Sequence, residues 1–131
     1  MLPAEAKPES DLVVLVDARN VLRSQWPNMP EAEVVERCGT WARLQGCRTI
    51  VVFDGRAPGG LRGEEVVDEH VTVVGTGGES ADDWIARTAE ELAASGRRFR
   101  VVTSDRGLRA RIHGAERIVG GGAFVRELAA L

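Results

Sequence analysis

The apolar residues of this chain gather in short runs that are rich in valine and isoleucine. Residues 12–16 read LVVLV, and residues 49–53 read TIVVF. Uninterrupted runs of this length are typical of strands that are covered on both faces of a sheet. Further strands are predicted within residues 66–74, where we place one at 70–74, and at residues 101–103 and 117–119.

Between these runs, apolar residues recur at the three- and four-residue spacing of helices. Val34 and Cys38 belong to such a face in residues 31–45, a segment that ends before Gly46. Helices are also predicted at residues 80–95, 106–113 and 123–130. Residues 55–63 contain four glycines and one proline, a composition that predicts a mobile loop.

Strands and helices thus alternate along the chain, and this alternation predicts the fold class. Parallel neighbouring strands need crossover connections, which helices supply. The expected fold is α/β, with three layers and a mostly parallel sheet of about five strands. Residues 11–131 are predicted to form one domain, preceded by a disordered leader at residues 1–10 that is rich in proline and glutamate.

The balance of charges argues against several functions. The formal net charge is −3, so general attraction to nucleic acid is not expected. Only one of the 17 cationic residues is a lysine, Lys7, and it lies in the predicted leader. A P-loop protein, a Schiff-base enzyme, a receiver domain and a haloacid-dehalogenase-type phosphatase each need a lysine in the folded domain. These classes are therefore disfavoured.

No segment predicts export or membrane insertion. Residues 1–10 lack the apolar core of a signal peptide, and no stretch approaches the ~18 apolar residues of a membrane span. Cys38 and Cys47 have no CxxC spacing, and we interpret them as buried free thiols of a reducing compartment. The sequence therefore predicts a cytoplasmic protein without membrane contact.

Three of the predicted strands are each followed by an aspartate at or near their end: Asp17, Asp54 and Asp105. The carboxyl ends of parallel strands meet at one edge of a sheet, where the ligand sites of such folds lie. Asp82 joins this set because the helix at residues 80–95 begins at the same edge. We expect these four carboxylates to lie close together.

The other acidic residues near Asp82 are ranked below it. On a helical wheel, Asp82 lies at the border of the buried face, whereas Asp83 points nearly opposite. Asp82 is therefore the preferred site residue. Glu79 and Asp83 are left open between a supporting role in the site and a role in capping the helix.

The predicted cluster of carboxylates suggests a metal-dependent reaction. Carboxylates that approach one another repel, and a cation relieves that repulsion. Oxygen ligands favour Mg²⁺ or Mn²⁺ over zinc, and such ions activate water and stabilise phosphoryl displacement. The pattern thus predicts metal-assisted hydrolysis. For each aspartate taken alone, a structural explanation stays open, because an aspartate after a strand often caps a helix.

Four short motifs surround these aspartates. They are VDARNV at residues 16–21, VFDG at 52–55, ESADDWI at 79–85 and VTSD at 102–105. In this order and spacing they resemble the YacP-like NYN branch of the PIN-domain-like ribonucleases, over about residues 12–126. The resemblance implies an endoribonuclease whose catalytic residues, Asp17, Asp54, Asp82 and Asp105, bind Mg²⁺ or Mn²⁺.

The same resemblance assigns supporting residues. Asn20 matches the asparagine of the first motif, which orients a carboxylate or the substrate phosphate. Ser104 matches the small hydroxyl residue before the last aspartate. The family more often has glycine and tyrosine where this chain has Ala18 and Arg19, a departure that bears on substrate preference.

Arginines beside the predicted site are candidates for contacts with RNA, the expected substrate. Arg19, Arg56 and Arg106 adjoin the aspartates, and guanidinium groups bind phosphate through paired hydrogen bonds. Trp26 is a further candidate, for stacking on a base. The alternative is a catalytically weak module that binds RNA or protein, and a small phosphatase or nucleotide-binding α/β protein is a third hypothesis. The sequence does not decide whether the chain forms a homodimer or binds a protein partner.

Overall fold

The computed structural model describes residues 11–24 and 29–131. The strands are β1 (Val13–Asp17), β2 (Arg48–Phe53), β3 (Gly63–Asp68), β4 (Val71–Gly75), β5 (Phe99–Val102) and β6 (Arg117–Val119). The helices are α1 (Ala18–Arg23), α2 (Glu31–Gln45), α3 (Ala81–Ala94), α4 (Arg106–Arg111) and α5 (Gly121–Ala129), and Pro58–Gly60 forms a 3₁₀ turn. The predicted leader and Trp26 lie outside the described residues.

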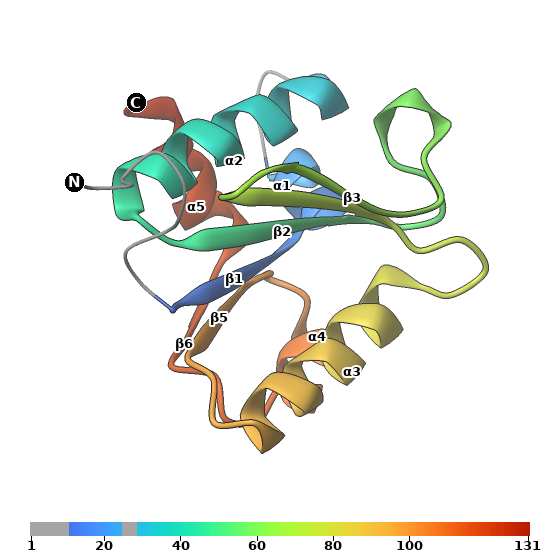
Figure 1. The fold of residues 1–131 in the computed structure, drawn as a ribbon, viewed down its shortest axis with the longest axis vertical. Coiled ribbons are helices and arrows are strands. Elements are labelled where there is room, and N and C mark those ends of the chain that lie inside the picture. The colour runs from blue at the N-terminus through green and yellow to red at the C-terminus, as the bar shows by residue number, and fades with distance from the viewer. Residues whose placement is uncertain (1–10, 25–28) are drawn as a thin grey trace.

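The six strands form one sheet with helices on both faces (Figure 1). Their order across the sheet is β3-β4-β2-β1-β5-β6. Every neighbouring pair is parallel except β3 and β4, which are antiparallel. The predicted three-layer α/β fold with a mostly parallel sheet is therefore confirmed.

The prediction of a single strand within residues 66–74 is wrong, because the region forms the hairpin of β3 and β4. The sheet consequently has six strands instead of about five. β3 lies at the edge and is exposed along almost its whole length, and it contains Glu64 and Glu65. A strand that buries so little has no apolar run to reveal it.

Two further elements differ from the prediction. α1 follows Asp17 directly and has only six residues, too few to show a helical repeat of apolar positions. Within the segment predicted to be a mobile loop, the backbone N–H of Ala57 donates a 2.9 Å hydrogen bond to the carbonyl of Leu61. This bond bridges the two ends of the 3₁₀ turn, within which the backbone N–H of Gly60 donates a 3.0 Å hydrogen bond to the carbonyl of Ala57. Gly63 already belongs to β3.

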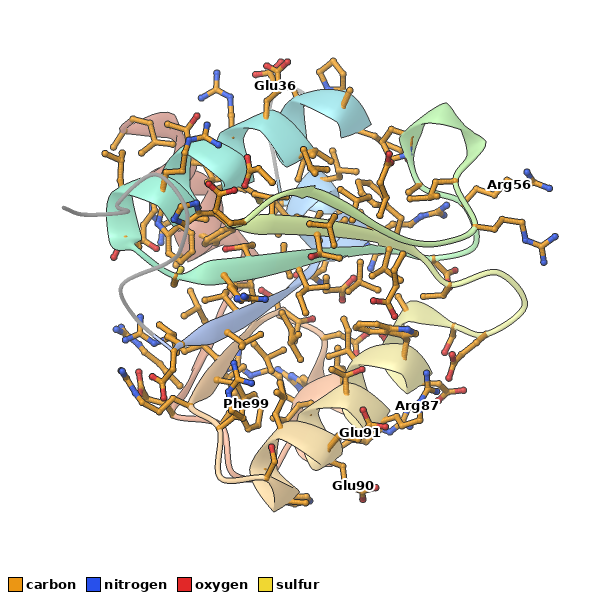
Figure 2. The ribbon with its side chains drawn as sticks, viewed as in Figure 1. Glu36, Arg56, Arg87, Glu90, Glu91 and Phe99 are labelled. Atoms are coloured by element: carbon orange, nitrogen blue, oxygen red, sulfur yellow. The ribbon has the colours of Figure 1, made fainter. Side chains whose placement is uncertain are left out.

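Each face of the sheet carries its own core because side chains alternate along every strand. Val14 and Val16 of β1 belong to the cluster that includes residues of α1, α2 and α5. Val13 and Leu15 belong to the cluster on the other face, with residues of α3 and α4. Figure 2 shows charged side chains, such as Glu90 of α3, directed away from the sheet.

Both cysteines are buried and free, as predicted. None of the helices in the described ranges is long and apolar enough to cross a membrane.

Candidate active site

The site lies where the three central strands end. β1 pairs with β2 on one side and with β5 on the other. The chain passes from β1 to β2 through helices on one face, and from β4 to β5 through α3 on the other. The connections thus diverge beside β1, and such a switch point opens a crevice at the carboxyl ends of the strands.

A pocket of about 180 Å³ occupies this crevice. It is lined by the four aspartates predicted from the sequence together with two arginines and the start of α3: Asp17, Asp54, Asp82, Asp105, Arg19, Arg23, Ser80 and Ala81. The fold therefore brings together residues that are as far apart in the chain as Asp17 and Asp105.

Asp17 is the most deeply buried of these aspartates, with 4% of its surface exposed. Its Oδ2 accepts a 3.0 Å hydrogen bond from the hydroxyl of Thr103. Burial raises the pKa of the Asp17 carboxyl, while hydrogen bonds from Thr103 and from the backbone of Asn20 oppose that rise. The negative charge of Asp82 raises the pKa of Asp17 further.

Asp54 and Asp105 each cap a helix while lining the pocket. Oδ1 of Asp54 accepts a 2.9 Å hydrogen bond from the backbone N–H of Ala81, at the start of α3. Oδ1 of Asp105 accepts one of the same length from Leu108, in the first turn of α4. The capping role that the sequence left open is therefore present. It engages one oxygen of each carboxylate.

The structure separates Asp82 from its acidic neighbours. Asp82 lines the pocket, and its pKa is raised by burial, then by the charge of Asp105, with Arg111 opposing the rise. Asp83 is exposed and pairs with Arg111 at 2.9 Å. Glu79 pairs with Arg87. Neither Glu79 nor Asp83 lines the pocket, so any role for them there is indirect.

Asn20 and Ser104 hold the connections around the pocket. Oδ1 of Asn20 accepts a 2.8 Å hydrogen bond from the backbone N–H of Ser104. The hydroxyl of Ser104 accepts one of 2.8 Å from Gly121, at the start of α5. These bonds tie α1, the segment that carries Asp105, and α5 to one another.

The predicted arginines differ in position. Arg19 lines the pocket and donates a 3.1 Å hydrogen bond to the backbone carbonyl of Asp54. Arg56 donates to the carbonyl of Gly60 and points outward in Figure 2. Arg106 is exposed and does not line the pocket.

Two residues of the site escaped the sequence analysis. Arg23 lines the pocket four residues after Arg19, so the helical spacing would have revealed it had α1 been predicted. Thr103 is fully buried beside Asp17. Thr103 could have been found in the sequence because it is a polar residue at the end of the apolar run of β5.

Among the described residues, no group of three or more His, Cys, Asp or Glu side chains is arranged as a metal centre. The donor chemistry nevertheless fits a hard divalent cation, because four carboxylates line one pocket. Burial and then the nearby negative charges raise the pKa of Asp82, and a cation would offset those charges.

A family model described as the YacP-like NYN domain matches residues 14–129. The chain belongs to this family. The YacP-like NYN family is one of ribonucleases, so the resemblance found in the motifs is confirmed. No curated protein sequence matches the chain.

Solved structures of a YacP protein share the fold. Rae1 (YacP) from Bacillus subtilis superposes with a TM-score of 0.66 at 24% sequence identity, covering 90% of this chain and 74% of that one. A single-substitution mutant of the same protein gives a TM-score of 0.69 at 24% identity, covering 90% of this chain and 75% of that one. The YacP-like NYN domain described here is thus PIN-like in its fold.

Proposed function

We propose that this YacP-like NYN protein is a divalent-metal-dependent endoribonuclease, and that Asp17, Asp54, Asp82 and Asp105 form its catalytic site. The observation that carries the proposal is the convergence of these four carboxylates on one pocket at the switch point of the sheet. Burial and, after it, the negative charges of Asp105 and Asp54 raise the pKa of Asp82, and a bound cation would relieve the repulsion among these carboxylates.

Mg²⁺ or Mn²⁺ would be held by these carboxylates, since both ions prefer oxygen ligands. Bound there, such an ion would supply activation of water and stabilisation of the negative charge that develops during phosphodiester hydrolysis. Asp54 and Asp105 can take part while they cap their helices, because each cap engages one carboxylate oxygen. Thr103 would keep Asp17 oriented toward the pocket.

Arg19 and Arg23 are the residues proposed to bind the RNA phosphate. Both line the pocket beside the aspartates, and a guanidinium group can donate two parallel hydrogen bonds to one phosphate. Such local groups are needed because the net charge of −3 gives no general attraction to RNA. Contacts of Arg56 and Arg106 with RNA remain predictions for more distant parts of the substrate.

The free thiols of Cys38 and Cys47 support a cytoplasmic location, where thiols stay reduced.

An assay of RNA cleavage in EDTA, Mg²⁺ and Mn²⁺ tests the proposal, with Asp105→Asn and Asp105→Ala compared. Both variants should lose cleavage. Only Asp105→Ala should also lose about 1 kcal/mol of unfolding free energy, because asparagine still caps α4 and alanine cannot.

Cleavage that persists in EDTA, or full activity in Asp105→Asn, would refute the proposal. RNA that is bound but stays intact with Mn²⁺ would instead support the alternative of a catalytically weak binding module.

A further inference from the structure

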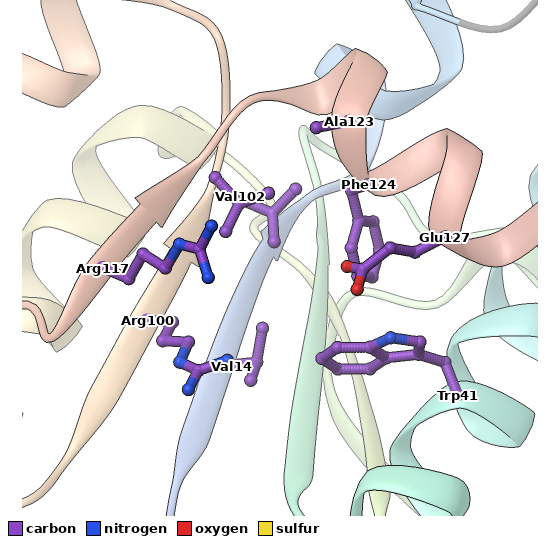
Figure 3. Close-up of a pocket in the computed structure, with 9 residues that line it drawn as sticks. Val14, Trp41, Arg100, Val102, Arg117, Ala123, Phe124 and Glu127 are labelled. Atoms are coloured by element: carbon purple, nitrogen blue, oxygen red, sulfur yellow. The ribbon is translucent and has the colours of Figure 1, made fainter.

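A second pocket lies on the opposite side of the sheet from α3, between β5, β6 and α5 (Figure 3). Its volume is about 140 Å³. Valines form its floor, at positions Val14, Val102 and Val119. Trp41 of α2 and Phe124 of α5 form an aromatic wall, their ring centroids 5.0 Å apart at an interplanar angle of 79°.

Three polar groups of this pocket lack partners. The indole N–H of Trp41 is the one buried side-chain donor or acceptor in the described part of the chain that forms no hydrogen bond. Only 6% of the Trp41 surface is exposed. Arg117 and Glu127 also line the pocket. Both are exposed to solvent, and within the described ranges neither side chain has a hydrogen bond or an ion pair with another protein group.

The charges around the pocket limit what can bind there. Arg100 and Arg117 stand opposite each other on neighbouring strands, and both point toward the pocket in Figure 3. Arg100 is already paired with Glu116 at 2.8 Å. This leaves Arg117 on the sheet side and Glu127 on the helix side as one positive and one negative charge without partners.

A ligand that satisfies these groups must be neutral overall and polar at its edges. An anion would be repelled by Glu127, and an apolar molecule would leave the indole N–H of Trp41 buried without an acceptor, which costs free energy. The valine floor and the aromatic wall suit a ligand with a planar ring system. The volume lies below the roughly 300–1,000 Å³ of sites for drug-sized ligands, so the ligand is small.

We propose that this pocket binds a guanine base. Guanine presents its O6 and N7 acceptors on one edge, where the fork of an arginine such as Arg117 binds them. Its N1–H and N2–H groups donate from the next edge, where the Glu127 carboxylate accepts them. Its N3 atom, beside N2, is the acceptor left for the indole N–H of Trp41. Adenine offers an amine donor in place of O6, so it cannot satisfy Arg117 and Glu127 in the same way. The ribose and phosphate would remain outside the pocket.

The test is a calorimetric titration of the protein with guanosine and with adenosine in EDTA. Guanosine should bind at least about tenfold more tightly than adenosine. Glu127→Gln and Arg117→Met should each weaken guanosine binding by about tenfold or more, because each removes a charged hydrogen-bond partner. The matched controls Glu90→Gln and Arg126→Gln change exposed residues outside the pocket and should leave the affinity unchanged.

A second arm identifies where the base comes from. A short single-stranded RNA with one guanosine is titrated beside the same RNA with adenosine instead, using Asp82→Asn in EDTA so that the RNA stays intact. Tighter binding of the guanosine-containing RNA, lost in Glu127→Gln, assigns the pocket to RNA. Binding of guanosine without this preference in RNA assigns it to free nucleosides or nucleotides.

The proposal is overturned if millimolar guanosine does not bind, if adenosine binds equally well, or if neither pocket substitution weakens binding. These results do not depend on cleavage, because the aspartates take no part in the pocket and the titrations contain no divalent metal. Failure of the proposed nuclease function would therefore leave this test unaffected.

Discussion

The hydroxyl of Thr103 donates a 3.0 Å hydrogen bond to Oδ2 of Asp17, although 86 positions separate the two residues in the chain. The same hydroxyl oxygen accepts a 3.1 Å hydrogen bond from the backbone N–H of Asp105. One buried side chain therefore joins the first and the last of the four aspartates, and it does so across the pairing of β1 with β5.

Replacing Thr103 with valine tests this connection. Thr103→Val keeps the shape of the side chain but leaves the buried Asp17 carboxylate without its hydroxyl donor. The free energy of unfolding should fall by about 1–3 kcal/mol, measured by urea denaturation. Thr72→Val is the matched control, since Thr72 is a half-buried strand residue whose hydroxyl forms no hydrogen bond among the described residues. An equal loss in the two variants would contradict the assigned role.

The pH dependence of stability should reveal the free-energy cost of ionising the buried Asp17 carboxyl. Burial raises the pKa of Asp17, so the folded protein holds a proton there more tightly than the unfolded chain does. The contribution of Asp17 to stability is therefore greatest below its unfolded pKa and falls as the pH rises through the folded pKa. Burial gives Asp82 a pKa shift of the same sign.

Asp17→Asn removes the free-energy cost of holding an ionised carboxylate at this buried position. In EDTA the variant should unfold at a higher temperature than the wild type at pH 7, and the difference should vanish below about pH 4, where the wild-type carboxyl is protonated. Thermal unfolding curves recorded between these two pH values provide the measurement. A variant that is less stable than the wild type at pH 7 would show that the hydrogen bonds to the ionised Asp17 outweigh its burial.

Most of the fold could be predicted because its central strands are buried on both faces. The uninterrupted apolar runs at β1 and β2 predict buried strands, and each run leads to an aspartate of the site. The edge strand β3 could not be found in this way, since Glu64 and Glu65 belong to a strand that stays exposed. An apolar pattern reports burial, and an edge strand has little of it.

The residues of the site also differ in how far the sequence predicts them. The convergence of Asp17, Asp54 and Asp105 follows from strand topology, which the sequence indicates. The contact of Thr103 with Asp17 depends on which strands are neighbours and on their register, and the position of Arg23 depends on the short helix α1. Neither relationship leaves a repeating pattern in the sequence.

The close approach of α5 to Asn20 gives a prediction about glycine. A Cβ atom on Gly121 would lie 2.5 Å from Oδ1 of Asn20 and 2.8 Å from Oγ of Ser24. Gly121→Ala should therefore displace Asn20 from its hydrogen bond with Ser104 and cost about 1–3 kcal/mol of unfolding free energy.

Gly122→Ala is the control on the same helix, because its Cβ would meet only Arg126 at 3.9 Å. This substitution should be neutral or stabilise the protein by up to about 1 kcal/mol, since alanine favours the helix. Urea denaturation of both variants measures the difference. Equal effects would contradict the role of the Asn20 contact.

The initial rate of RNA cleavage with Mn²⁺, compared between Asp82→Asn and Asp83→Asn, tests the central claim most directly. The two substitutions remove the same charge from adjacent positions, but only Asp82 lines the pocket, whereas Asp83 is exposed and pairs with Arg111. We predict that Asp82→Asn lowers the rate at least about 100-fold and that Asp83→Asn changes it by no more than about twofold. Equal rates in the two variants, or an Asp82→Asn protein that cleaves as fast as the wild type, would contradict the assignment of the pocket as the catalytic site.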